Sequence, residues 1–208
     1  MASYPPRMET TGLRERKKRQ TRRALSDAAI ALFLDRGFDA VSVAEVAAAA
    51  DVSKPTLFRY FPAKEDLVLH RFADHEAEES RVVAARPEDE SPLAALHRHF
   101  LDGLARRDPV TGLSDDAGVL AFLRLLYGTP SLVARLYAYQ QRSEEALAEA
   151  LGGGLAARLA AGQIVAVRRV LAEENGRRIA AGESADAVYP DAVAAADLAF
   201  RQLTDGLT

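Results

Sequence analysis

The residues best suited to making specific contacts lie in one short run, Lys54–Tyr60, with the sequence KPTLFRY. Within this run the sequence gathers two cations, a hydroxyl group and aromatic rings. Cations and hydroxyl groups donate hydrogen bonds to phosphates and base edges, and aromatic rings pack on sugars or on thymine methyl groups. Because such a run is neither an ordinary core segment nor an ordinary solvated helix face, it predicts a binding surface for nucleic acid.

The spacing within this run predicts a short helix with one buried side. Each residue of a helix turns by about 100°, so if Leu57 faces inward then Phe61 does too. Lys54 and Tyr60 then lie on the flanks. A helix of about seven residues does not persist alone, so the packing of Leu57 and Phe61 must hold it in place. The outward positions are Pro55, Thr56, Phe58 and Arg59.

The flanking residues predict how this helix is positioned. Ser42 and Glu45 have the spacing of a capping box, so we expect a preceding helix to start at Val43. Ser53 offers a new N-cap, and Pro55 then falls in the first turn, where its missing N–H would have no partner. Two short helices joined by a tight turn predict a helix-turn-helix, in which Lys54 and Thr56 reach base edges and Arg59 reaches a base or a phosphate.

Further cations surround the motif. Leu13–Arg23 carries seven Lys or Arg against one Glu, a density typical of phosphate-binding arms, although basic helix starts also occur in proteins that bind no nucleic acid. Lys64 opens the next helix, where a cation opposes the helix dipole unless an external anion such as a phosphate binds there. The predicted DNA-contacting set consists of Lys54, Pro55, Thr56, Phe58, Arg59, Tyr60, Lys64, Ser42, Arg19 and Arg22.

Composition limits the alternatives. The 208 residues have a net charge of −3, but residues 1–64 carry twelve Lys or Arg against seven Asp or Glu. The absence of cysteine excludes disulfides, thiolate zinc sites and cysteine nucleophiles. The sequence lacks both an apolar run of about 18 residues and the apolar centre of a signal peptide. We therefore expect a cytoplasmic protein that does not enter a membrane.

The rest of the chain predicts an all-α fold. A first helix is expected at 14–35, closed by Gly37 with Phe38 folding back on it. Pro and Gly punctuation then separates further helices, and no alternating strand pattern or internal repeat occurs. Their expected spans are 64–84, 92–106, 115–127, 130–151, 155–181 and 190–206.

The segment RRALSDAAIALFLDRGFDAVSVAEVAAAADVSKPTLFRYFPAK, residues 22–64, resembles the N-terminal domain of TetR-family transcriptional regulators. The resemblance implies a flexible arm at 1–13, a three-helix DNA-binding domain with the helix-turn-helix at 14–63, and a larger helical bundle for effector binding and dimerisation at 64–208. It also implies a homodimer that binds a palindromic double-stranded DNA operator, most often as a repressor that a small-molecule effector releases. For this chain we expect no enzymatic activity and no cofactor.

Two positions depart from the family pattern. Asp51 occupies the turn position that is commonly Gly, so the left-handed conformation costs more there. Phe58 replaces the usual phosphate-contacting Tyr, so it can only pack on a sugar or a thymine methyl, whereas Tyr60 keeps a hydroxyl group that can reach a phosphate. The turn is expected to remain intact, and the contact of Phe58 is expected to change.

Beyond residue 70 the sequence is less specific. Its aromatic stripes predict either core or a ligand pocket. The final helix carries small and large apolar residues in one stripe, which predicts either an internal face or a dimer interface. No metal site is expected, because neither His97 and His99 nor His70 and His75 are spaced to chelate from one helix face. The candidates for ligand contact are Phe100, Phe122, Tyr127 and Tyr137, and those for the dimer interface are Ala192, Ala196, Ala199, Phe200 and Leu203.

Three functions agree with these patterns. The first, which we favour, is a ligand-responsive DNA-binding regulator. The second is a helical enzyme or small-molecule carrier with an incidental basic N-terminus, although no catalytic or nucleotide-binding motif is present. The third is a DNA-binding regulator that answers to a protein partner instead of a small molecule.

Overall fold

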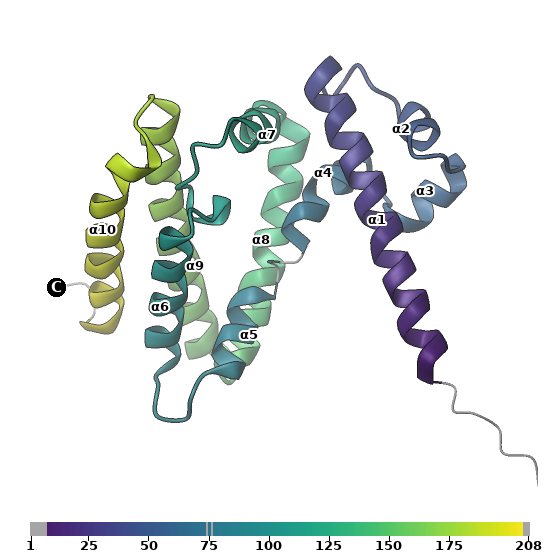
Figure 1. Ribbon diagram of the computed structural model, residues 1–208. Helices are drawn as coiled ribbons and strands as arrows, with labels where there is room; N and C mark the ends of the chain where they lie inside the picture. Colours follow the sequence, from purple (N-terminus) through teal and green to yellow (C-terminus); the bar gives the residue numbers. More distant parts are fainter. Residues whose placement is uncertain (1–7, 74, 76, 206–208) are drawn as a thin grey trace, which may run out of the picture. The chain divides into compact units, whose positions relative to one another are not determined.

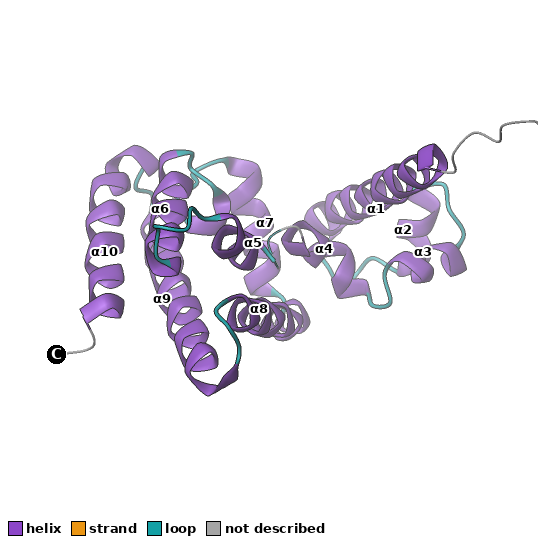
Figure 2. Ribbon diagram, turned by 90° about the horizontal axis from the view of Figure 1, so that it is seen from below, coloured by secondary structure: helices purple, strands orange, loops and turns teal. Residues whose placement is uncertain are grey.

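The computed structural model describes residues 8–73, 75 and 77–205, and the regular elements among them are all helical (Figures 1 and 2). This confirms the expected all-α fold. The elements are α1 (Met8–Arg36), α2 (Val43–Ala49), α3 (Lys54–Tyr60), α4 (Lys64–Ala73), α5 (Glu78–Ala85), α6 (Pro92–Ala105), the 3₁₀ turn η1 (Pro109–Thr111), α7 (Ala117–Gly128), α8 (Pro130–Ala150), α9 (Gly154–Ala180) and α10 (Ala185–Asp205).

The chain forms two compact units. The first extends as far as Arg71 and also includes Leu125–Arg135, and the second contains Phe72–Arg124 and the chain from Leu136 onward. The first unit therefore extends past residue 63, where the sequence predicted the end of the DNA-binding domain.

The first unit is built around α1. Leu25 and Phe33 on this helix are almost fully buried, and the hydroxyl of Ser26 donates a buried hydrogen bond to the Leu67 carbonyl of α4 at 2.7 Å. Gly37 closes α1 with a left-handed φ of 87°, and the ring of Phe38 packs 4.9 Å from that of Phe33. The expected glycine cap of the first helix is thereby confirmed, and it directs the chain into α2.

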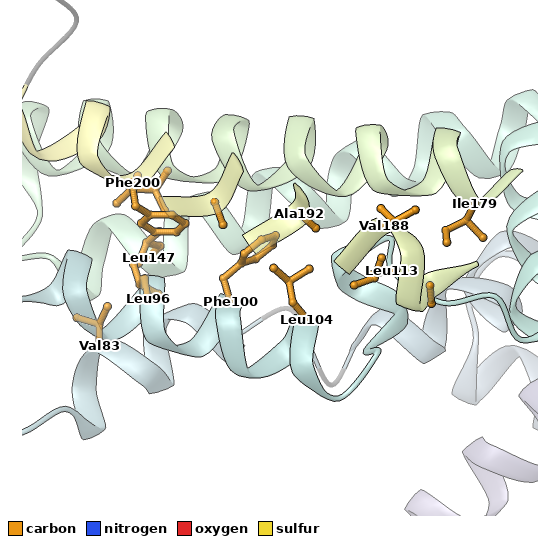
Figure 3. Close-up of a cluster of buried hydrophobic side chains, with 14 of the residues drawn as sticks. Val83, Leu96, Phe100, Leu104, Leu113, Leu147, Ile179, Val188, Ala192 and Phe200 are labelled. Carbon is orange, nitrogen blue, oxygen red and sulfur yellow. The ribbon is translucent and has the colours of Figure 1, made fainter. Parts of the chain in front are cut away.

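The second unit has a core formed mainly by α6, α9 and α10, which lie side by side (Figures 1 and 2). Figure 3 shows Phe100 of α6 and Phe200 of α10 among the buried side chains, with ring centroids 6.3 Å apart. The hydrophobic residues at this centre remove apolar surface from water, which holds the three helices together. They include Leu96, Phe100, Leu104, Leu113, Ile179, Val188, Ala192, Ala196 and Phe200.

Three expected boundaries were wrong. The span 64–84 is two helices, α4 and α5, and the chain passes from the first unit to the second within the last turn of α4. Residues 8–13 of the predicted arm belong to α1, whereas residues 1–7 lie outside the described part. The last helix starts at Ala185, before Pro190, because Ser184 accepts a hydrogen bond from the Ala187 N–H as an N-terminal cap.

Within the described residues, no single helix is long and apolar enough to cross a membrane. Only α7 and α8 taken together, with a bend of 97° between them, satisfy length and composition.

Candidate nucleic-acid interface

The capping box at the start of α2 is present as predicted. The Glu45 N–H donates to Ser42 Oγ at 3.2 Å, and the Ser42 N–H donates to Glu45 Oε2 at 2.8 Å. The hydrogen bond from the Ser42 N–H to the carboxylate, followed by those from the Ser42 hydroxyl and from Arg36, lowers the pKa of Glu45 to about 2. Ser42 remains exposed while its hydroxyl oxygen caps the helix.

The turn between α2 and α3 is closed by backbone geometry and a second cap. Asp51 takes a left-handed φ of 53°, so the turn forms despite the absence of glycine. Ser53 Oγ accepts from the Thr56 N–H at 3.2 Å, and Pro55 occupies the first turn. Leu57 is fully buried and Phe61 is 3% exposed, so the inner side of α3 is as predicted. The cap and these two side chains fix a seven-residue helix that would not persist alone.

The outer side of α3 presents the predicted contact groups. The Lys54 ammonium lies 5.9 Å from the centroid of the Phe58 ring, and the Arg59 guanidinium carbon lies 5.8 Å from that of Tyr60. Phe58 is 40% exposed, so part of its ring is open to contact with a ligand. Each cation therefore lies beside an aromatic ring, and none of the seven residues of α3 is acidic. Lys54, Pro55, Phe58 and Arg59 are exposed, and Thr56 and Tyr60 are partly buried.

Lys64 has an internal role that the sequence did not predict. Its ammonium group donates to the Phe38 carbonyl and lies 4.2 Å and 5.2 Å from the ring centroids of Phe38 and Phe33. A carbonyl and two aromatic faces stabilise a cation, so they offset its unfavourable position at the start of α4. An external anion is therefore not needed to explain Lys64, and its phosphate contact remains a prediction.

The basic residues of α1 fall into two groups. Arg22 is partly buried, and its Nη2 donates to the Tyr60 carbonyl at 3.3 Å, so it joins α1 to the end of α3. Arg19 is exposed, as are Arg16, Lys17 and Lys18. Arg22 thus positions α3, whereas Arg19 is available to a ligand.

A second positioning pair joins α4 to α8 within the first unit. Arg135 donates to both carboxylate oxygens of Asp66, at 2.8 Å and 3.2 Å, and Asp66 also accepts from the Ala63 N–H at 3.1 Å. Asp66 is 5% exposed, so its charge is compensated by these donors. The partners are 69 residues apart, and no local pattern indicates such a pair.

The structure does not bring the four predicted ligand-contacting residues together. Phe100 lies in the core of the second unit, and Phe122 packs against Phe72 with ring centroids 6.0 Å apart. Tyr127 and Tyr137 are 59% and 62% exposed. The aromatic stripes therefore do not form one pocket.

Three residues of the predicted dimer stripe on α10 lie in the core of the second unit and not on its surface. Ala192, Ala196 and Phe200 are 3%, 0% and 2% exposed and pack in the core of their own chain, so they cannot meet a partner. Leu203 also packs against this core, and Ala199 is partly buried. A stripe of small and large apolar residues suits close packing equally well inside a chain and between chains, so its sequence could not distinguish the two.

A polar cluster in the second unit was also missed. Arg168 of α9 pairs with Glu79 of α5, and its side chain is only 11% exposed. Burial lowers the pKa of Arg168 to about 10, so the guanidinium stays charged at neutral pH. Arg168 Nε and Glu79 Oε2 have no hydrogen-bond partner among the described residues. These partners are 89 residues apart, beyond the reach of sequence spacing.

A small pocket adjoins this cluster. It is lined by Arg168, Phe100, Thr111, Gly103 and His99, among others, and its volume of about 10 Å³ matches one water molecule. Within the described part of the chain, no group of three His, Cys, Asp or Glu side chains is placed to hold a metal ion.

Comparison with known proteins gives the context of this surface. Residues 25–70 match the family model described as bacterial regulatory proteins, tetR family. The chain is 37% identical to the HTH-type transcriptional regulator TcmR of Streptomyces glaucescens over 64% of this chain and 58% of TcmR. It is 31% identical to the HTH-type transcriptional repressor LfrR of Mycolicibacterium smegmatis over 68% of this chain and 66% of LfrR. The matches thus span less than two thirds of each relative.

Solved structures share the fold. A putative TetR-family transcriptional regulator from Mesorhizobium loti superposes with a TM-score of 0.55 at 20% identity, covering 88% of this chain and 96% of that one. NalD, the secondary repressor of the MexAB-OprM multidrug efflux pump in Pseudomonas aeruginosa, superposes with a TM-score of 0.54 at 19% identity, over 89% and 96%. With the capped helix-turn-helix, these likenesses lead to one assignment: residues 25–70 belong to the tetR family of bacterial regulatory proteins, and the chain shares the fold of the solved TetR-family structures.

Proposed function

We propose that this protein is a ligand-responsive transcriptional regulator, most often acting as a repressor, that binds a palindromic DNA operator as a homodimer. The observation that carries the proposal is the outer side of α3, where two cations and exposed aromatic rings lie on a helix held by Ser53 and Leu57. Such a helix enters the major groove with its N-terminal residues against base edges. Lys54 and Thr56 then read bases, and Arg59 contacts a base or a phosphate.

The experiment is a selection of bound duplexes from random sequence, followed by affinity measurements on the selected operator. Arg59→Ala and Lys54→Ala should change which bases are selected, because contacts to base edges carry the specificity. Affinity should fall steeply between about 50 and 200 mM salt, since bound cations release counterions from the duplex. Equal affinity at both salt concentrations would exclude this mode of binding and favour the enzyme or carrier alternative.

For the homodimer, we propose the exposed apolar side of α9 in place of the stripe on α10. Leu155, Leu159 and Val170 are 71%, 58% and 55% exposed. At 100° per residue these three fall within an arc of about 60°, so they form one continuous apolar side. A palindromic operator requires a two-fold protein, and a second copy presents the same side to complete the contact.

Sedimentation at micromolar concentration tests this interface. Leu159→Asp should give monomers, because a carboxylate in an apolar contact loses its hydration without a partner. The matched control is Leu198→Asp on α10, where the leucine is 52% exposed but lies outside the proposed side. A dimer that survives Leu159→Asp would exclude α9 as the contact.

The effector site proposed for the second unit is the pocket beside Arg168. The unpartnered Arg168 Nε offers a buried donor to an oxygen of a small molecule, and Phe100 offers an apolar wall. Because the pocket holds about one water molecule, an effector must separate the helices around it, which provides a route to a change in DNA affinity. The effector is expected to lower DNA affinity, and DNA then weakens effector binding by the same factor.

A thermal-shift screen tests effector binding, since a ligand of the folded state raises the melting temperature. Compounds that stabilise the wild type should not stabilise Arg168→Met, and should still stabilise Arg169→Met, which alters the exposed neighbour. If hits stabilise all three proteins equally, the pocket is not the site. If a broad screen gives no hit, a regulator that answers to a protein partner becomes the better account.

A further inference from the structure

We propose that the basic stretch Arg16–Arg19 of α1 is a second DNA-contacting element, which binds phosphates flanking the base pairs that α3 reads. The inference rests on the proposed function, because it requires a duplex at the outer side of α3. It adds a DNA-binding surface outside the helix-turn-helix. This surface lengthens the stretch of DNA that the protein contacts, but it contacts phosphates and therefore does not select bases.

This stretch has no packing role in the described structure. Among the side chains of α1 that the structure describes, from Arg16 onward, full burial begins at Leu25, and each residue from Arg16 to Gln20 is exposed. Five consecutive helical residues cover the whole circumference of a helix. No side of this segment therefore packs against another described part of the chain, although it continues the same helix that forms the centre of the first unit.

The position of the stretch is fixed by Arg22. The hydrogen bond from Arg22 to the Tyr60 carbonyl, with its guanidinium carbon 5.9 Å from the Phe61 ring centroid, places α1 against the C-terminal end of α3. With a rise of 1.5 Å per residue, Arg16–Arg19 lies about 4–9 Å further along the axis. Figure 1 shows this part of α1 extending beyond α2 and α3. The cations of Arg16–Arg19 thus lie near α3, beyond its C-terminal end.

The charges of this stretch are uncompensated within the described structure. Four consecutive cations lie there, and none of them pairs with a described carboxylate. Elsewhere, exposed arginines find carboxylates, as in the pairs Arg98–Glu90 and Arg169–Glu173. Adjacent like charges repel, and a duplex with one phosphate charge per about 1.7 Å relieves that repulsion. Arg16 and Arg19 share one side of the helix and are the first candidates for phosphate contact.

The test compares two operator duplexes with the full-length protein. One duplex ends at the outermost base pair defined by the selection, and the other extends about ten base pairs further on each side. The variant replaces Arg16, Lys17, Lys18 and Arg19 with Gln. The charge-matched control replaces Arg98, Arg169, Arg177 and Arg201, all exposed on the second unit, with Gln.

The wild type and the control should bind the extended duplex about tenfold or more tightly than the trimmed one, and the variant should bind both alike. The variant's salt slope should be shallower by about 4, which corresponds to two phosphate contacts per protomer. Equal wild-type affinity for both duplexes, or a variant that keeps the gain from the flanks, would overturn the inference while leaving the proposed function intact. Absence of sequence-specific binding by the wild type would overturn both.

Discussion

The outer side of α3 and the inner side of α10 each carry a phenylalanine, in opposite surroundings. On α3, Phe58 is 40% exposed beside a cation, whereas on α10 Phe200 is 2% exposed within the core. Both sides were predicted from the sequence to be binding surfaces. The two helices are held in place differently. A cap and two buried side chains hold α3, which leaves its outer side free. In α10 the apolar stripe that was predicted to meet a partner is the part that packs in the core.

The largest expected effect comes from placing a charge in the buried stripe. Ala196→Arg should lower the free energy of unfolding by more than about 3 kcal/mol, because a fully buried alanine leaves no room for the side chain and no partner for its charge. Urea unfolding followed by circular dichroism measures this. Ala194→Arg, at an exposed position of the same helix, should cost little. Similar stability of the two variants would show that the stripe is not core.

A smaller effect is expected at the pair that positions α4. Asp66→Ala should lower the free energy of unfolding by about 2 kcal/mol, because the variant loses a helix cap and the partner of the half-exposed Arg135. Asp66→Asn keeps a cap acceptor and should lose less. Denaturant titration of the three proteins gives the order. If alanine and asparagine are equally destabilising, the charge of Asp66, and not its cap, is what matters.

Variants of two helix N-caps distinguish an effect on stability from an effect on DNA binding. Ser53→Ala and Ser91→Ala each remove an N-cap hydroxyl, that of α3 and that of α6, and each should lower the free energy of unfolding by about 1 kcal/mol. Only Ser53→Ala should also weaken operator binding, because the side chains proposed to contact DNA lie on the outer side of α3. Melting temperatures and operator titrations distinguish the two. Equal losses of DNA affinity would mean that the cap acts through global stability.

The smallest effects concern two carboxylates with a lowered pKa. Hydrogen bonds from His75 and then His99 lower the pKa of Glu78 from 4.5, and the bonds from Ser42 lower that of Glu45 to about 2. A lowered folded-state pKa gives stability that is present above the unfolded pKa and lost as the pH falls. Between about pH 5 and pH 3, Glu78→Gln should therefore lose less stability than the wild type.

The exposed Glu45 should contribute less to this acid dependence, because solvent screens its interactions. Unfolding of the wild type, Glu78→Gln and Glu45→Gln at successive pH values measures both contributions. Identical slopes for the wild type and Glu78→Gln would contradict the assignment of Glu78.

Local signals explain what the sequence could predict. The starts of α2 and α3 follow from Ser42, Glu45, Ser53 and Pro55, because a cap and the helix that it begins lie within four residues. The inward position of Leu57 follows from helical periodicity alone. The candidate DNA surface was therefore accessible from the sequence as a set of outward-facing groups.

The features that were missed depend on distant partners. The neighbours of Lys64 come from the end of α1, Asp66 meets Arg135 across 69 residues, and Arg168 meets Glu79 across 89. Contacts between residues so far apart in the sequence produce no local pattern from which they could be predicted. The stripe of α10 failed for a different reason: periodicity reports that a helix has an apolar side, but not which surface covers that side.

The first unit is discontinuous, and this limits how the chain can be divided. Leu125–Arg135 belongs to it although 53 residues of the second unit, Phe72–Arg124, intervene. A fragment that stops at Arg71 would appear to be a minimal DNA-binding domain, yet it lacks the fully buried Leu126 and Leu132 and the counter-ion of Asp66. Gene fusions or truncations that cut the chain after Arg71 would therefore remove a structural part of the unit that contains the helix-turn-helix.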